Sequence, residues 1–439
     1  MSADSAPNQA VKAGPASSMD NAKWNRLHTL AVVCTLGGTA LDGYILGVVG
    51  DSIVAATGEM HFSPVAQGLI GASALIGIFI GGMFFGRAAD KWGRKIVFQW
   101  NQVAFVILSV LQLFAVGTVD LVIYRILLGL AIGVEYAVGA ALLSEFVPAR
   151  TRAALLSTLQ VTWFVGFVSA NFVARAWAGQ DWRMVLASSA IPALVIAIVR
   201  RWLPESPRWL QTVGRDAEAQ AIVDKHFPAG TTLPPVEVTE KAGQFSELFS
   251  KEQRKTTIYG GIFWACQVGP IFAIFTFITP VLDGIGLPTG FWRDFIMNML
   301  QLAGAAVFVW VLAATKRRFF AISTFAAVLV ALLVIGLFPN APIGVLAVAI
   351  GAYLFIASGA SNLQFVYPSE MFPTRLRTSG VGFSASMSRV GAALATYLLP
   401  VLIATFGTNA SLLMLAIFPV VGLIGSVLWA PETSRRAID

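Results

Sequence analysis

The sequence predicts an all-α membrane protein of twelve transmembrane helices, arranged as two six-helix halves in the same orientation. Three observations predict it: an apolar composition, twelve apolar runs of membrane-spanning length, and a motif that repeats half a chain apart. Of the 439 residues, 56% are hydrophobic and 12% are charged, whereas soluble globular proteins carry about 25% charged residues. Mean hydropathy is +0.74. The composition therefore excludes a soluble globular protein.

The apolar runs set the number of spans. A helix needs roughly 20 residues to cross a hydrocarbon core about 30 Å thick. Runs of this size form two groups of six, at about 28–50, 64–86, 96–117, 121–143, 154–176, 183–203, 257–282, 293–315, 319–338, 343–366, 378–401 and 408–429. The expected organisation is a disordered cytoplasmic tail (1–27), an N-terminal six-helix bundle (28–203), a cytoplasmic loop with short helices (204–256), a C-terminal six-helix bundle (257–429) and a cytoplasmic C-terminal tail (430–439).

The distribution of Lys and Arg orients the chain. Cytoplasmic loops of membrane proteins carry an excess of these residues. If both termini are cytoplasmic, 25 of the 30 Lys and Arg lie on that side. Only Arg175, Arg183 and Arg293 lie on the other side, and Arg125 and Arg389 lie inside the membrane. We therefore expect both termini in the cytoplasm, and the net positive charge needs no nucleic-acid partner to explain it.

Cysteine and histidine usage argues against a disulfide framework, a metal site or a cofactor. Cys34 and Cys266 both lie inside apolar runs, which favours buried thiols. The three histidines are His28, His61 and His226; none lies in the middle of a span, and no Cys/His cluster has metal-ligand spacing. Without a histidine inside the membrane, a membrane-embedded enzyme is not expected.

Two loop motifs occur twice. Residues 144–152 (SEFVPARTR) recur 225 positions later as 369–377 (SEMFPTRLR). Residues 202–208 (WLPESPR) recur 227 positions later as 429–435 (WAPETSR). A duplicated six-helix unit with both copies in one orientation is typical of transporters, in which two halves surround a central site.

These loops carry a family resemblance. Residues 86–95 (GRAADKWGRK) resemble the signature of the major facilitator superfamily between its second and third helices, and residues 125–133 (RILLGLAIG) resemble its fourth-helix motif. Residues 204–208 (PESPR) and 431–433 (PET) resemble the sugar-porter branch. The resemblance covers the whole chain and implies the fold of that superfamily, transport by alternating access, and a functional monomer without a partner protein.

Motifs inside the spans narrow the resemblance. Residues 41–44 (LDGY), 133–136 (GVEY), 264–267 (WACQ) and 388–391 (SRVG) are most similar to a subgroup of bacterial inner-membrane metabolite transporters whose substrates are mostly undefined. The resemblance therefore implies a multi-pass protein of the bacterial inner membrane.

The seventh span departs from the hexose carriers of this branch. Those carriers have a Gln-Gln pair, an Asn and a Tyr-Tyr pair in it, whereas this chain keeps Gln267 and has Val268, Ala273, Phe277 and Ile278 at the other positions. A hexose needs many hydrogen bonds, and a polar substrate left unpaired in a dry site binds poorly. Hexose transport is therefore not expected.

Two further departures concern charge. The sugar porters have Gly-Tyr-Asp on the first helix, whereas this chain has Gly43, Tyr44 and Ile45, with Asp42 one turn earlier. The second-half copy of the loop signature is reduced to residues 316–318 (KRR), without its acidic residue.

The repeated loop charges have two readings. They are either solvated charges that set the topology or an ion-pair latch that joins the two halves on the inner face when the carrier opens outward. Opposite charges at matching helix ends, together with the family resemblance, favour the latch. The predicted cytoplasmic gate consists of Gly86, Asp90, Arg94, Glu145, Arg152, Glu205, Arg208, Glu370, Arg377 and Glu432.

Four ionisable residues lie within or near the spans: Asp42, Arg125, Glu135 and Arg389. A charge near the bilayer centre costs about 2.5–3.5 kcal/mol even on a lenient scale, so each is expected to have a partner or to face water. Asp42 and Arg125 are expected to pair, either as a permanent brace or as a proton switch, and the switch is favoured. Glu135 is the second candidate for proton coupling.

Arg389 is expected to anchor the substrate. No acidic residue is evident in the second-half spans to neutralise it, and a guanidinium facing a cavity suits a carboxylate or phosphate. The residues expected to bind substrate around it are Gln160, Gln267, Asn362, Gln364, Tyr44 and Trp264, with Asn171, Trp163 and Phe365 nearby.

The sequence thus predicts a secondary active transporter of a small polar metabolite, an organic acid or anion, driven by protons through alternating access. The alternative is a sugar or polyol transporter of the same fold, either a proton symporter or a uniporter. The expected partners are the substrate, protons and the lipid bilayer.

Overall fold

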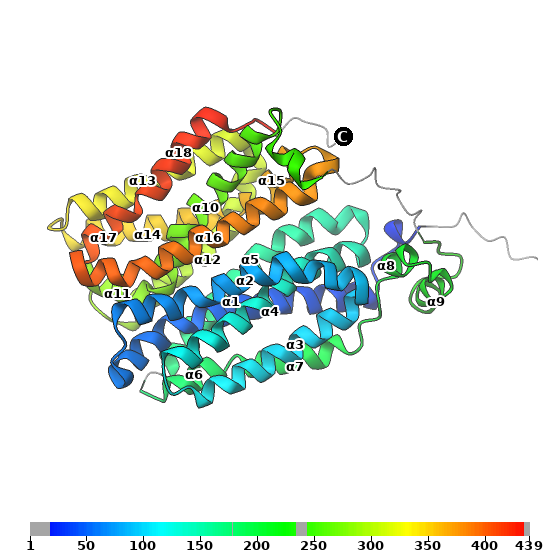
Figure 1. Cartoon of the computed structure of the whole chain (residues 1–439), viewed down its shortest axis with the longest axis horizontal. Helices are drawn as coiled ribbons and strands as arrows, with labels where there is room; N and C mark the ends of the chain where they lie inside the picture. Colours follow the sequence, from blue (N-terminus) through cyan, green and yellow to red (C-terminus); the bar gives the residue numbers. More distant parts are fainter. Residues whose placement is uncertain (1–17, 178, 234–243, 434–439) are drawn as a thin grey trace, which may run out of the picture.

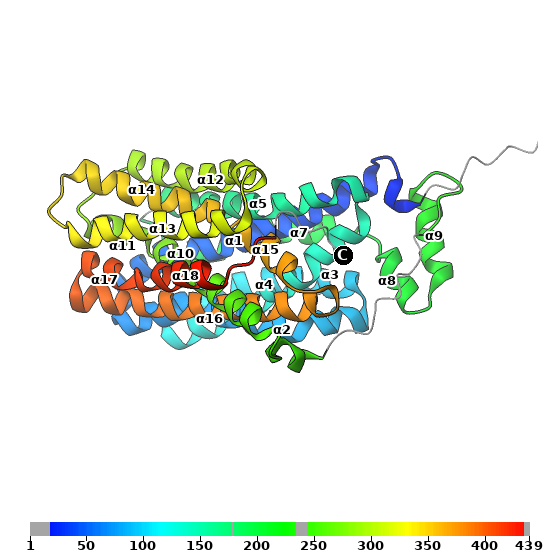
Figure 2. The same cartoon turned by 90° about the horizontal axis from the view of Figure 1, so that it is seen from above.

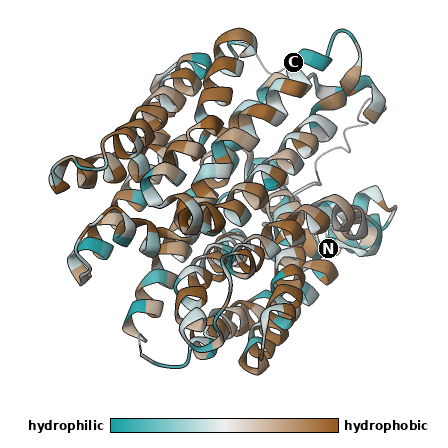
Figure 3. Ribbon diagram, turned by 60° about the vertical axis from the view of Figure 1, so that its left-hand side comes forward, coloured by the Kyte–Doolittle hydropathy of each residue, from teal (hydrophilic) through white to brown (hydrophobic). Residues whose placement is uncertain are grey.

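The computed structural model describes residues 18–177, 179–233 and 244–433. Within them, twelve helices are long and apolar enough to cross a membrane, which confirms the predicted number of spans. Figure 3 shows apolar residues along most of each helix, with hydrophilic residues gathered at helix ends and in loops. This distribution suits a bundle surrounded by hydrocarbon.

The first half comprises the helices α1 to α7. They are α1 (Arg26–Met60), α2 (Pro64–Trp92), α3 (Arg94–Leu111, followed by the short η2, Gln112–Phe114), α4 (Thr118–Phe146), α5 (Ala149–Ala176), and a sixth span formed by α6 (Trp182–Ala187) and α7 (Ala190–Arg200). Between the halves lie α8 (Pro207–Thr212), α9 (Asp216–His226) and η3 (Phe245–Phe249).

The second half comprises α10 to α18. They are α10 (Arg254–Thr276) with its continuation α11 (Ile278–Gly284), α12 (Phe291–Ala314), α13 (Arg317–Leu337), α14 (Ile343–Ala360) with its continuation α15 (Leu363–Met371), α16 (Thr374–Phe406), and a last span formed by α17 (Thr408–Leu415) and α18 (Ile417–Trp429). The seventh and tenth spans are therefore interrupted at Phe277 and at residues 361–362.

The two halves lie side by side with their helices along a common direction (Figures 1 and 2). Helices α8 and α9 project from one end of the bundle (Figure 1). We call this the terminal end, and the opposite end the far end. The loops at Arg94, Pro148, Arg317 and Pro373 belong to the terminal end, so the basic loops gather there.

Glycines allow the closest helix contacts. A Cβ on Gly129 of α4 would lie 1.9 Å from the carbonyl oxygen of Ala74 in α2, and one on Gly166 of α5 would lie 1.7 Å from that of Ala40 in α1. Such distances exclude any side chain. Small residues that let helix backbones touch are the usual basis of helix packing in membranes.

The segment before α1 is not the disordered tail that was expected. Residues 1–17 of that tail lie outside the described residues, but residues 18–25 pack against the helices between the halves. Met19 is 1% exposed, its N–H donates to the carbonyl of Thr232 at 3.0 Å, and the Asn25 amide donates to the carbonyl of His226 at 3.0 Å. For residues 18–27 the prediction of disorder is therefore wrong.

Candidate functional site

The buried charges pair differently from the sequence expectation. Arg125 of α4 is 1% exposed, and its Nη1 donates to the carbonyl oxygen of Ile45 at 2.9 Å. Ile45 occupies the place of the aspartate in the Gly-Tyr-Asp pattern. No hydrogen bond or ion pair joins Asp42 to Arg125 within the described residues, and the Nε and Nη2 atoms of Arg125 have no partner there. The predicted pair is therefore wrong: Arg125 binds the helix backbone where that carboxylate is missing.

Glu135 has a partner of its own. Both of its oxygens accept hydrogen bonds from Arg200 at the end of α7, and Oε2 also accepts from Asn101 of α3 at 3.1 Å. Arg200 further donates to the carbonyl of Phe98 at 2.9 Å and to that of Cys34 at 3.1 Å. A buried ion pair is tolerated when its remaining hydrogen-bonding groups are satisfied in this way. Glu135 is therefore fixed inside the first half.

Asp42, unlike Glu135, has no ion-pair partner within the described residues. Its side chain is 0% exposed, and neither carboxyl oxygen has a hydrogen-bond partner within the described residues. The charged side chains whose fields reach it are those of Glu135, Arg200 and Arg389. Because Glu135 and Arg200 are paired with each other, Arg389 is the remaining cation among these three side chains.

Arg389 of α16 crosses from the second half toward the first. Its guanidinium carbon lies 5.4 Å from the ring centre of Tyr136 in α4 and 5.6 Å from that of Phe272 in α10. Both distances lie within cation–π range. Its Nη1 atom has no hydrogen-bond partner within the described residues. The arginine is thus held between two rings with hydrogen-bonding capacity to spare.

Three predicted polar residues gather at the break between α14 and α15. The Nε2 atom of Gln160 in α5 donates to the Ser361 hydroxyl at 2.9 Å, across the two halves. The Nε2 atom of Gln267 donates to the carbonyl of Ala360 at 2.9 Å. The Asn362 amide donates to the carbonyl of Ala305 at 2.8 Å. The interruption of the tenth span thus supplies the groups that hold Gln160 and Gln267, and it contains Asn362 itself.

The remaining predicted binding residues are less closely grouped. Tyr44 lies elsewhere, because its hydroxyl bonds to that of Ser188 at 2.7 Å inside the first half. Trp264 and Gln364 are buried at 4% and 7% exposure. Trp163 stacks on Phe167 with ring centres 5.3 Å apart. The side chain of Phe365 lies outside the described residues.

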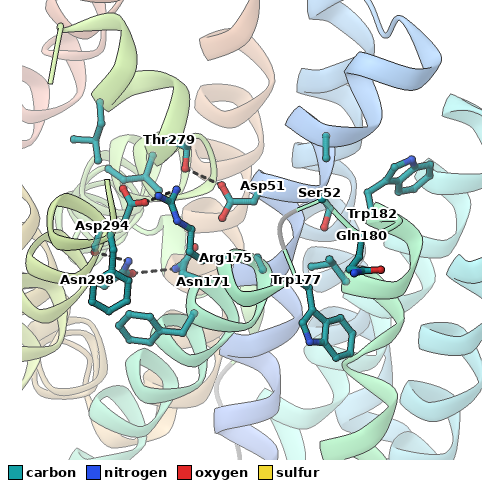
Figure 4. Close-up of a pocket in the computed structure, with 18 of the residues that line it drawn as sticks. Asp51, Ser52, Asn171, Arg175, Trp177, Gln180, Trp182, Thr279, Asp294 and Asn298 are labelled. Atoms are coloured by element: carbon teal, nitrogen blue, oxygen red, sulfur yellow. Dashed lines mark hydrogen bonds and ion pairs between the residues drawn. The ribbon is translucent and has the colours of Figure 1, made fainter. Parts of the chain in front are cut away.

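A cavity of about 220 Å³ lies at the far end between the halves (Figure 4). Three polar contacts cross it: Thr279 donates to Asp51 at 2.7 Å, Arg175 pairs with Asp294 at 2.9 Å, and the Asn171 amide donates to that of Asn298 at 3.1 Å. We call these three pairs the far-end clasp. Asn171 belongs to this clasp and not to the surroundings of Arg389.

Sequence reasoning missed most of the clasp. Asp51 follows the predicted end of the first span, and Asp294 lies at the predicted start of the eighth, so both read as charges at the membrane surface. A signal was present in their opposite partner, since Arg175 is one of the few basic residues assigned to that side. The sequence pattern does not show that α5 and α12 lie close enough for Arg175 and Asp294 to pair.

The predicted gate residues form matching networks in the two halves. Arg94 pairs with Glu145 at 2.9 Å, and Arg317 pairs with Glu370 at 3.3 Å. Both pairs join a helix that begins at the terminal end to the helix of the repeated loop motif. Arg317 therefore does in the second half what Arg94 does in the first, although the signature around it is reduced.

The second repeated motif caps helices. Glu205 accepts from the backbone N–H of Lys95 at 3.0 Å, and Glu432 accepts from that of Arg317 at 3.1 Å. A carboxylate at a helix N-terminus satisfies otherwise unpaired N–H groups. Each of these contacts stays within one half, so the role of a latch between the halves stays a prediction.

The other gate residues lie at the same end. Arg152 and Arg208 both donate to the carboxylate of Asp20 in the segment before α1. Arg377 lies in the first turn of α16. The surroundings of Gly86 and the side chain of Asp90 lie outside what the structure describes.

Comparison with known proteins identifies the family. The sequence model of the family described as sugar (and other) transporter matches residues 20–439. The chain belongs to this family. It is 37% identical over 423 residues to the inner membrane metabolite transport protein YgcS of Escherichia coli strain K12, covering 94% of both chains. This sugar-porter member of the major facilitator superfamily is a multi-pass protein of the bacterial inner membrane, and a transporter rather than an enzyme.

Solved structures agree on the fold. The partially occluded inward-open xylose transporter XylE from E. coli superposes with a TM-score of 0.77 at 20% identity, covering 94% of this chain and 99% of that one. Its inward-open form gives a TM-score of 0.76 at 20% identity, with 94% and 98% covered. Three of the more distant relatives have names that state a substrate. The probable plastidic glucose transporter 3 of Arabidopsis thaliana is 27% identical, covering 84% of this chain and 78% of that protein. The major myo-inositol transporter IolT of Bacillus subtilis is 26% identical, covering 94% of this chain and 93% of that protein. The niacin transporter NiaP of Acinetobacter baylyi is 25% identical, covering 85% and 87%.

Proposed function

We propose that this transporter carries a small organic anion together with a proton, as a monomer that alternates access between its two halves. The observation that carries the proposal is the buried carboxylate of Asp42 together with the half-buried guanidinium of Arg389. Asp42 lies in the first half and Arg389 in the second; within the described residues, neither the carboxyl oxygens of Asp42 nor the Nη1 atom of Arg389 have a hydrogen-bond partner. An uncompensated charge in a protein interior is strongly disfavoured.

Charge balance supplies the coupling. When the site holds no substrate, ionised Asp42 neutralises Arg389. When an anion binds to Arg389, two negative groups compete for one guanidinium, and Asp42 takes up a proton. The anion and the proton therefore bind together, and neither is released alone without leaving a buried charge. Glu135 is the weaker candidate for this proton, because Arg200 and Asn101 occupy its oxygens.

The basic loops at the terminal end indicate the orientation of the protein in the membrane. With the terminal end in the cytoplasm, the far-end clasp faces the outside and closes that side in this conformation. The opposite conformation would open the clasp and bring the repeated terminal-end motifs together. The predicted latch would then act in that second conformation.

The test uses proteoliposomes that contain a pH-sensitive dye, with protein-free vesicles beside them because weak acids cross bilayers unaided. Protein-dependent acidification of the lumen on adding a carboxylate supports the proposal. Asp42→Asn should abolish uphill accumulation and spare exchange of labelled for unlabelled substrate. Asp51→Asn is the matched control on the same helix, and should keep uphill transport because Asp51 belongs to the clasp.

The second candidate is a neutral sugar or polyol. It is favoured by the family, by the substrates named for XylE and IolT, and by the amides of Gln160 and Gln267. A neutral substrate leaves the guanidinium of Arg389 without a ligand. Niacin, the substrate in the name of NiaP, is a carboxylic acid and would supply one. Acidification with polyols and not with carboxylates would select this candidate and reduce Arg389 to a structural role.

A further inference from the structure

The amides around the α14–α15 break point to a second requirement on the substrate. Gln267 and Asn362 are 5% and 7% exposed. Each uses its amide nitrogen to donate to a backbone carbonyl, at Ala360 and Ala305 respectively. Those bonds fix which end of each amide is the oxygen, because only the NH₂ group can donate to a carbonyl.

The two amide oxygens are left over. Within the described residues, neither Gln267 Oε1 nor Asn362 Oδ1 has a hydrogen-bond partner. Most buried polar atoms in native proteins do have one, so each exception needs an explanation. Both atoms are acceptors only, and the groups that would satisfy them are donors such as hydroxyls.

The helix that carries Gln267 packs against the helix that carries Arg389. Helices α10 and α16 touch, since a Cβ on Gly391 would lie 2.6 Å from the carbonyl oxygen of Ala265. Gly391 is two residues after Arg389, and Ala265 is two residues before Gln267. The guanidinium also packs on Phe272 of α10. Arg389 therefore lies on a helix in contact with α10, and Gln267 of α10 in turn binds the carbonyl of Ala360, two residues before Asn362.

We propose that the substrate is a polyhydroxylated carboxylate, of the chemical class of the sugar acids. Its carboxylate binds Arg389, and its hydroxyls donate to Gln267 and Asn362. An acid without hydroxyls leaves both amide oxygens unpaired, and a polyol leaves the guanidinium unpaired. A site with buried acceptors rejects a ligand that lacks the matching donors. This inference rests on the proposed anion function and narrows it.

The test compares ligands of equal chain length. Gluconate, glucitol and hexanoate share a six-carbon chain; xylonate, xylitol and pentanoate share five; threonate, threitol and butanoate share four. Binding is measured by calorimetry on the full-length protein in lipid nanodiscs, with cooperative thermal unfolding as the sign that it is folded. The hydroxylated acid of at least one series should bind about tenfold or more tightly than both of its partners.

Other results separate the two proposals. If a hydroxyl-free acid binds as tightly as its hydroxylated form, the anion function stands and the hydroxyl requirement falls. If a polyol binds as tightly as the acid, both fall. Absence of binding in all three series, by folded protein, also overturns the hydroxyl requirement.

Variants assign the contacts. Arg389→Gln should weaken binding of the hydroxylated acid about 100-fold and leave the polyol unchanged. Asn362→Ala should weaken the hydroxylated acid about tenfold and leave the hydroxyl-free acid unchanged. Asn409→Ala is the matched control. The Asn409 amide also donates to a helix carbonyl, that of Ile335, but Asn409 lies on α17, outside the proposed site. Equal losses for both acids in Asn362→Ala would contradict the assignment.

Discussion

Glu135 and Arg200 form a doubly hydrogen-bonded ion pair in which the two side chains are 2% and 1% exposed. The pair joins α4 to α7, and α1 passes directly beside it at Gly38. A Cβ on Gly38 would lie 2.0 Å from Glu135 Oε1 and 2.2 Å from Arg200 Nη2. The absence of a side chain at residue 38 is therefore a condition for the pair.

We expect Gly38→Ala to destabilise the protein, because the added methyl group separates the pair or displaces α1. Breaking a buried ion pair typically costs about 3–5 kcal/mol, so the unfolding temperature in detergent should fall by about 3–5 °C. Gly58→Ala is the control on the same helix, where a Cβ meets nothing within 4 Å. It should leave the unfolding temperature unchanged or raise it slightly. Equal shifts for both variants would contradict this account.

Removing the pair as a whole should be less harmful than removing either member. Arg200→Met alone leaves a buried carboxylate, and Glu135→Leu alone leaves a buried guanidinium, so each should lower the unfolding temperature. The double variant leaves neither charge and should recover most of the loss. If it also retains uphill transport, Glu135 is excluded from proton coupling. If the double variant keeps its unfolding temperature but no longer accumulates substrate in response to a proton gradient, Glu135 takes part in proton coupling.

Hydropathy alone located every span, because each helix must bury or face hydrocarbon over roughly 20 residues. It could not pair the charges. Arg200 ends an apolar run and reads as a loop charge, and its partner Glu135 lies 65 positions earlier on another helix. The distance between α4 and α7 depends on helix packing, which no periodicity in the sequence records. The same reason hid the pairing of Arg175 with Asp294.

The internal repeat was readable because charged and proline positions recur at a nearly fixed offset. Its second-half loop signature reads as degraded, since it lacks an acidic residue at 316–318. The structure shows that the contact survives, with Arg317 bound to Glu370. Glu370 is the repeat counterpart of Glu145, the partner of Arg94, so this contact does not depend on the acidic residue lost from the loop signature. A motif search within one loop does not detect a contact between two loops.

The far-end clasp should control opening of that side. Arg175→Ala removes the ion pair with Asp294, which joins α5 to α12. A partly exposed ion pair contributes about 0.2–1 kcal/mol, so the ratio of open to closed molecules should rise by a factor of about 1.4 to 5. The measurement is the labelling rate of a cysteine introduced at Ser52, which lines the cavity. Cys34 and Cys266 are first replaced by serine, and the maleimide reagent does not cross membranes.

Arg183→Ala is the matched control for the clasp. Arg183 also lies at the far end, but its ion pairs with Glu59 and Asp181 stay within the first half. It should leave the labelling rate at residue 52 unchanged. Acceleration by both variants would mean that general loosening of the far end, and not the contact between the halves, controls access.

Asp20 should hold the segment before α1 in place. One carboxylate accepts hydrogen bonds from Arg152 on α5 and from Arg208 on α8, and thereby ties the helices between the halves to the first half. Asp20→Asn removes the charge and keeps the shape, so residues 18–25 and α9 should exchange amide hydrogens about two- to fivefold faster, in keeping with partly exposed ion pairs. Asp216→Asn, at the start of α9, is the control and should change exchange only in its own helix. Unchanged exchange at residues 18–25 in Asp20→Asn would show that the buried Met19 and the backbone bond to Thr232 suffice to hold the segment.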